Sequence, residues 1–123
     1  MLTGSFKTYA GPGRICIARY APRGTPAGYR VFKALAPDQD MLRMDRAAYL
    51  PRYRAILDRL DPQATWDHLH ALAGDAEPVL LCWEAPPFTA SNWCHRRIVA
   101  DWFQARLGAS VPEFNPNLPL GLE

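Results

Sequence analysis

The sequence of 123 residues predicts one small α/β domain, with a largely parallel sheet flanked by helices. Residues 78–84 form a short, continuous apolar run, which is typical of a strand buried on both faces of a parallel sheet. Segments before and after this run carry apolar residues at helical spacing. The composition, 49% hydrophobic and 21% charged, is that of a globular protein. We expect one domain over 1–123, with its core at about 14–113 and an extended tail at 111–123.

The N-terminal part predicts one strand and one long loop. Residues 14–19 alternate, with Ile15 and Ile17 on one face, and glycine precedes them. Residues 22–28 contain two prolines and two glycines, so they form a loop. Residues 29–36 form a short element that ends at proline and whose type the pattern leaves open.

Three helices are predicted from apolar stripes and their end signals. The first begins near Asp45. Its apolar stripe starts at Tyr49 and continues at the spacing i+4, i+7, i+8 and i+11 from that residue. The second is capped by Asp61 with Pro62 at its first position, and it ends at Gly74. The third opens with Cys94-His95-Arg96-Arg97, after a loop through Asn92, and ends at Gly108. The aromatic residues on these stripes are expected in the core: Tyr53, Trp66, Trp102 and Phe103.

Composition also excludes several classes of protein. No apolar stretch approaches the roughly 18 residues of a membrane span, and the first residues lack a signal-peptide core, so we expect a soluble cytoplasmic protein without membrane contact. The three cysteines are few, odd in number and unclustered, which argues against a disulfide framework and fits a reducing compartment.

Charge is concentrated at the N-terminus. Residues 1–37 contain six basic and no acidic side chains, whereas the rest contains eight basic and twelve acidic ones. Such a segment favours an anionic partner, namely a nucleotide, another phosphate ligand or a nucleic acid. The alternative is that the arginines reflect GC-rich codon usage and are simply solvated.

The candidate site lies between the end of the apolar strand and the start of the last helix. Cys82 and Glu84 end the strand, and Cys94, His95 and Arg96 open the helix. In open α/β sheets, ligands bind beyond the carboxyl ends of the strands, where helix N-termini present free N–H groups.

Each of these residues has a catalytic and a structural interpretation. A helix N-terminus beside histidine and arginine lowers a thiol pKa, so Cys94 is the candidate nucleophile and the most reactive cysteine, although free cysteines are often simply buried. His95 is either an acid/base or a structural imidazole. Glu84 is expected to orient an arginine or histidine, the alternative being a lone surface carboxylate.

Ligand binding is assigned to four further side chains. Arg96 and the helix amides would hold the anion, because Arg96 and Arg97 diverge on a helix and only one can face the site. Arg19 or Arg23 would close over the ligand from the basic loop, and Asn92 lies in the loop before the helix.

Neither a metal nor a cofactor is expected. No compact C-x-x-C spacing is present, and neighbouring Cys94 and His95 are expected to diverge. His68 and His70 also point apart on their helix. Glycine-rich phosphate loops, G-x-S-x-G and H-E-x-x-H are all missing from the sequence.

The sequence resembles a bacterial family, domain of unknown function 488. The resemblance spans roughly 14–113 and rests mainly on Leu-Leu-Cys-Trp-Glu at 80–84 and Cys-His-Arg at 94–96. It implies a small soluble α/β domain with Glu84, Cys94, His95 and Arg96 at the hallmark positions, and no established activity. The nine residues between Glu84 and Cys94 exceed the short link typical of the family, so Phe88 and Trp93 are expected to reshape the mouth of the site.

We therefore expect a protein that binds, or chemically processes, a phosphate-bearing ligand at this junction. One alternative is a non-catalytic module that contacts nucleic acid or protein through the basic segment. Another is a purely structural cluster that locks the last helix to the sheet. The oligomeric state stays open.

Overall fold

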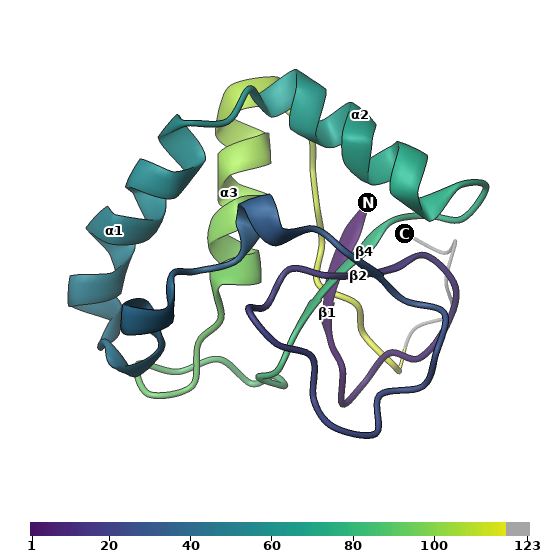
Figure 1. The fold of residues 1–123 in the computed structure, drawn as a ribbon, viewed down its shortest axis with the longest axis horizontal. Coiled ribbons are helices and arrows are strands. Elements are labelled where there is room, and N and C mark those ends of the chain that lie inside the picture. The colour runs from purple at the N-terminus through teal and green to yellow at the C-terminus, as the bar shows by residue number, and fades with distance from the viewer. Residues whose placement is uncertain (118–123) are drawn as a thin grey trace.

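A computed structural model describes residues 1–117 (Figure 1). The centre of the fold is a parallel sheet of four strands in the order β1-β4-β2-β3. The strands are β1 (Leu2–Ser5), β2 (Arg14–Cys16), β3 (Arg30–Val31) and β4 (Val79–Cys82). This arrangement confirms the predicted α/β fold with a parallel sheet.

Strand β4 is paired on both sides, and all four of its residues are buried. Leu80 aligns with Thr3 of β1 and with Ile15 of β2. The apolar run at 78–84 is therefore the buried strand that the sequence predicted. Its last two residues, Trp83 and Glu84, extend beyond the sheet edge.

Strand β1 was not predicted, and strand β2 is shorter than expected. The sequence of β1 is Leu-Thr-Gly-Ser, in which the three buried residues are Thr3, Gly4 and Ser5. Small polar residues give no apolar alternation, so periodicity cannot reveal this strand. The sequence left the type of the element at 29–36 undecided. In the structure it consists of β3 followed by a 3₁₀ turn, Lys33–Leu35.

Within the described residues, the α-helices are α1 (Arg46–Asp58), α2 (Pro62–Ala73) and α3 (His95–Leu107). A second 3₁₀ segment, Gln39–Arg43, precedes α1. The side chain of Asp61 accepts a hydrogen bond from the amide of Ala64, and Gly108 ends α3 with a φ of 67°. The predicted caps and ends of the helices are thus confirmed.

The helices pack on one face of the sheet, and loops cover the other (Figure 1). Ile15 and Leu80 point into the core shared with the helices, whereas Val79 and Leu81 pack against residues of the loops and the C-terminal segment. Of the four aromatic residues predicted in the core, three are buried and Trp66 packs against the core half-buried.

The C-terminal segment adds to the sheet edge. Glu113 forms a parallel bridge with Thr3, and the amide of Phe114 donates to the Thr3 carbonyl over 2.7 Å. The part of the expected tail at 118–123 lies outside the described residues. Over the described part of the chain, every helix is too short or too polar to cross a membrane.

Candidate functional site

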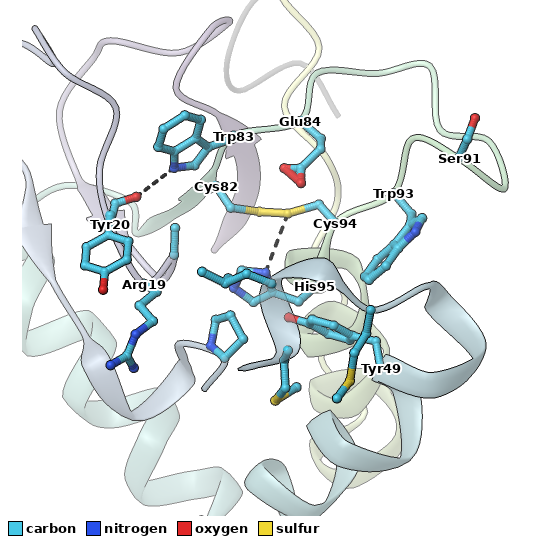
Figure 2. Close-up of a pocket in the computed structure, with 15 residues that line it drawn as sticks. Arg19, Tyr20, Tyr49, Cys82, Trp83, Glu84, Ser91, Trp93, Cys94 and His95 are labelled. Atoms are coloured by element: carbon cyan, nitrogen blue, oxygen red, sulfur yellow. Dashed lines mark hydrogen bonds between the residues drawn. A yellow bond between two sulfur atoms is a disulfide. The ribbon is translucent and has the colours of Figure 1, made fainter. Parts of the chain in front are cut away.

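A cavity of about 490 Å³ opens at the carboxyl edge of the sheet (Figure 2). Its walls come from segments far apart in the sequence: the residues after β2, the residues after β4, the first turn of α1, and the start of α3. Of the residues predicted for the site, it is lined by Arg19, Glu84, Cys94 and His95.

Cys82 and Cys94 line this cavity and form a disulfide (Figure 2). The expectation of no disulfide was therefore wrong. The two residues are 12 positions apart and belong to different elements, so their spacing carries no pattern that could have paired them. The contact arises because the end of β4 meets the beginning of α3. The remaining cysteine, Cys16, is free and buried.

His95 has a fixed orientation inside the protein. Its Nε2 atom lies 2.7 Å from the carbonyl oxygen of Ile17, which can only accept a hydrogen bond, so Nε2 carries the proton. The other nitrogen, Nδ1, lies 3.8 Å from the Cys94 sulfur. Burial lowers the pKa of His95 to about 4; the hydrogen bond to Ile17 opposes this shift, and the charge of Arg96 adds to it. The imidazole is therefore neutral at pH 7.

The side chains of Cys94 and His95 converge, contrary to the prediction. Cys94 is the residue before the helix and has an extended backbone, with φ −143° and ψ 144°, so helical spacing does not apply to it. As a result, one donor atom from each of Cys82, Cys94 and His95 lies within 4.8 Å of the others. With the disulfide reduced, these three buried side chains could hold a metal ion.

Arg96 is completely buried and faces away from the cavity. Its Nε and Nη2 atoms donate to the Glu113 carboxylate over 2.9 and 2.8 Å, and Nη1 lies 3.2 Å from the Cys82 sulfur. The carboxylate that orients Arg96 is therefore Glu113, and the prediction that favoured Glu84 was wrong. Nothing in this geometry supports the predicted contact between Arg96 and an anion.

Glu84 lies at the mouth of the cavity, above the disulfide (Figure 2). Among the described residues, its carboxylate has neither an ion pair nor a side-chain hydrogen bond. Burial, with the nearby negative charge of Glu84 as a second cause, raises the pKa of Tyr49. The carboxylate is thus available to a ligand in the cavity.

The other predicted ligand residues occupy three different places. Arg19 lines the cavity, and its Nε donates to the Gln39 side chain over 3.0 Å. Arg23 lines a separate pocket of about 280 Å³. The Asn92 amide donates to the carbonyls of Ala85 and Pro87, both over 2.8 Å, so it holds the loop together.

A family model described as "Active DUF488-N3 subclade" matches residues 4–107. This chain belongs to the DUF488 family. No curated protein and no solved structure matches it significantly. The match confirms the resemblance drawn from the Leu-Leu-Cys-Trp-Glu and Cys-His-Arg segments; it begins earlier than expected, within β1, and ends at residue 107, before the expected limit of about 113.

Aromatic side chains of this DUF488 protein complete the cavity walls, and most were missed from the sequence. Tyr20 and Trp83 are about half exposed, at 56% and 45%, and the Trp83 indole donates to the Tyr20 carbonyl over 2.7 Å. Trp93 packs edge-on against Tyr49, with ring centroids 4.7 Å apart. Of the two aromatic residues of the long loop that were expected to reshape the mouth of the site, Trp93 lines this cavity, whereas Phe88 lines a separate pocket.

Proposed function

We propose that this DUF488 protein is an enzyme that binds a nucleotide-type anion in the cavity and attacks it with the reduced thiol of Cys94. The observation that carries the proposal is the position of His95: its Nε2–H donates to the Ile17 carbonyl, and its unprotonated Nδ1 lies 3.8 Å from the Cys94 sulfur at the cavity wall. The description of the matching family as an active subclade also supports an enzyme.

The arrangement of His95 suits the activation of a cysteine nucleophile. Such sites need a base near the thiol and a third group that orients the base. Here Nδ1 is the base and the Ile17 carbonyl is the orienting group. In the reduced protein, the thiol proton would pass to Nδ1 while the sulfur bonds to an electrophilic carbon or phosphorus atom. The leaving group would depart with its electron pair.

The cavity walls favour a ligand that has both an aromatic ring and a negative charge. A volume of about 490 Å³ suits a molecule of nucleotide size. Tyr20, Trp83 and Trp93 offer faces or edges for a ring. Arg19 supplies a guanidinium, which binds phosphate well, and Glu84 can accept hydrogen bonds from ring amines or sugar hydroxyls.

One observation favours the alternative of a non-catalytic nucleic-acid module. Trp83 lines the cavity and also the second pocket, where Lys7 and Arg23 are found. An exposed indole between two pockets with cationic side chains is suited to a single strand of nucleic acid. Such binding would weaken steeply with salt and would not need Cys94.

The test is binding and turnover of the reduced protein with a panel of nucleoside mono-, di- and triphosphates. Calorimetry measures binding, and chromatography with mass spectrometry measures products. Cys94→Ala is expected to bind normally but to lose turnover by about 1,000-fold or more. Arg19→Gln is expected to weaken binding by about tenfold, and Cys16→Ser serves as the matched cysteine control. Unchanged turnover in Cys94→Ala, or no binding of any nucleotide, would contradict the proposal.

A further inference from the structure

We infer that the reduced protein binds a zinc-class divalent cation through Cys82, Cys94 and His95, with the fourth coordination position open to the cavity. The three donor atoms lie within 4.8 Å of one another, and the Cys94 sulfur and His95 Nδ1 are 3.8 Å apart. In tetrahedral zinc sites, ligand distances of about 2.3 Å to sulfur and about 2.0 Å to nitrogen separate the donors by roughly 3.5–3.8 Å. After reduction, the two sulfurs would have to move apart from bonding distance to this separation.

The imidazole is held as metal-ligating histidines are held. Its Nε2–H donates to the Ile17 carbonyl over 2.7 Å, which leaves the lone pair of Nδ1 free on the side of the Cys94 sulfur, 3.8 Å away. An N–H donated to a backbone carbonyl fixes both the tautomer and the ring plane of a histidine ligand. A disulfide by itself requires no such partner, because it has no open valence for an imidazole.

The surroundings of Cys82 also suit a thiolate. The Nη1 atom of Arg96 lies 3.2 Å from the Cys82 sulfur, and Arg96 is held in place by Glu113. A guanidinium at that distance stabilises negative charge on sulfur. Since two thiolates balance the charge of a divalent cation and Glu113 balances Arg96, the buried cluster would be neutral overall.

The fourth position would face the cavity. All three donor residues line it, and Glu84 stands at its mouth. Two cysteines, one histidine and an open position form a set found in catalytic zinc sites, whereas structural zinc sites are closed by four protein ligands. Water, the Glu84 carboxylate or a ligand in the cavity could occupy that position.

Metal binding and the disulfide exclude each other. The cation replaces one proton on each thiol, so binding releases two protons and transfers no electrons. The disulfide has no thiols to give. A bound cation would also cover the sulfur of Cys94, so the metal-free reduced protein is the form that the proposed thiol chemistry requires.

The experiment is a titration of the reduced, metal-free protein with Co²⁺ and with Zn²⁺. We expect one ion per chain, a dissociation constant of about 1 µM or below for Zn²⁺, and the visible and sulfur-to-cobalt absorption bands of a tetrahedral Co²⁺ thiolate site. The oxidised protein should bind neither ion. If the reduced protein takes up no metal at micromolar concentration, the inference is wrong.

Variants then identify the ligands. Cys82→Ser and Cys94→Ser are expected to lose the thiolate bands or bind far more weakly, and His95→Gln to weaken Zn²⁺ binding at least tenfold. Cys16→Ser is the control, because the Cys16 thiol donates a hydrogen bond to the Ala18 carbonyl and lies outside the donor cluster. Circular dichroism checks that each variant is folded. Equal metal uptake by a folded Cys82→Ser, Cys94→Ser double variant would overturn the assignment.

Protection from alkylation gives a readout that is independent of enzymatic activity. Zn²⁺ should slow the alkylation of Cys82 and Cys94 and leave that of Cys16 unchanged. Metal uptake without nucleotide turnover would contradict only the proposed function. Turnover without metal uptake would contradict only this inference.

Discussion

The guanidinium of Arg96 and the carboxylate of Glu113 form an ion pair of 2.8 Å that joins the start of α3 to the C-terminal segment. Arg96 is completely buried, and the Glu113 side chain is 18% exposed. The same carboxylate accepts a hydrogen bond from Thr3 of β1 over 2.7 Å. One acidic residue thus connects three segments behind the cavity.

Glu113→Gln is expected to lower the free energy of unfolding by about 3 kcal/mol, because it leaves a buried guanidinium without its counter-charge. Urea denaturation of the wild type and the variant measures this difference. The control is Asp40→Asn, which removes one of the two carboxylates paired with Arg52, in an exposed ion pair of 3.0 Å, and should leave stability unchanged. Equal effects of the two substitutions would show that the buried pair has no special role.

Cys94 is expected to be the most reactive thiol of the reduced, metal-free protein. Its sulfur lies at the cavity wall beside Nδ1 of His95, whereas burial raises the pKa of Cys16. We expect alkylation of Cys94 to be at least about tenfold faster than that of Cys16, measured by mass spectrometry of peptides. Without reduction, Cys82 and Cys94 should both stay unmodified. Faster labelling of Cys16 would remove the case for a Cys94 nucleophile.

The stability of the protein should fall at alkaline pH because of Tyr49 and Tyr53. Burial raises the pKa of both phenols, and the Tyr53 hydroxyl donates to the Leu35 carbonyl over 2.6 Å. The unfolded chain therefore loses these protons at a lower pH than the folded chain. The contribution of these phenols to the free energy of unfolding is therefore constant below about pH 10 and decreases as the pH rises further.

Denaturation at several alkaline pH values, together with the absorbance of phenolate, checks this expectation. Both phenols should ionise only as the protein unfolds. In Tyr49→Phe, the loss of stability between neutral and alkaline pH should be smaller than in the wild type. A phenolate signal from both residues in the folded protein would contradict the assignment.

Gly13→Ala should destabilise the sheet strongly. Gly13 has a φ of +81°, and an added Cβ would lie 2.0 Å from the carbonyl oxygen of Glu77. Its own carbonyl accepts a hydrogen bond from the amide of Val79 over 2.9 Å, so any shift disturbs the start of β4. We expect a loss of about 3 kcal/mol or more.

The matched control for this substitution is Gly24→Ala. Gly24 has a similar φ of +76°, but an added Cβ meets nothing within 4 Å. Only the cost of the left-handed conformation should appear, about 1 kcal/mol. Thermal or urea unfolding of both variants compares the two effects. Losses of equal size would show that the contact with Glu77 is easily relieved.

Local patterns in the sequence were sufficient to predict the helices, the central strand and the general location of the cavity. The cap at Asp61 and the stop at Gly108 act through their own backbone neighbours, so they can be read without knowledge of the fold. The apolar run of β4 likewise reports burial directly, because a strand covered on both faces must be apolar throughout.

Pairings between distant side chains were decided only by the tertiary structure. Arg96 meets Glu113 across 17 positions, and Cys82 meets Cys94 across 12. These contacts depend on how β4, α3 and the C-terminal segment pack, and residue spacing carries no information about that packing. The neighbours Cys94 and His95 show the same limit. They were expected to diverge on a helix, but Cys94 precedes α3 with an extended backbone, so the two side chains converge. The sequence by itself placed Glu84, Cys94 and His95 at one edge of the sheet, while packing decided which other side chains join them there and which groups face one another instead of a ligand.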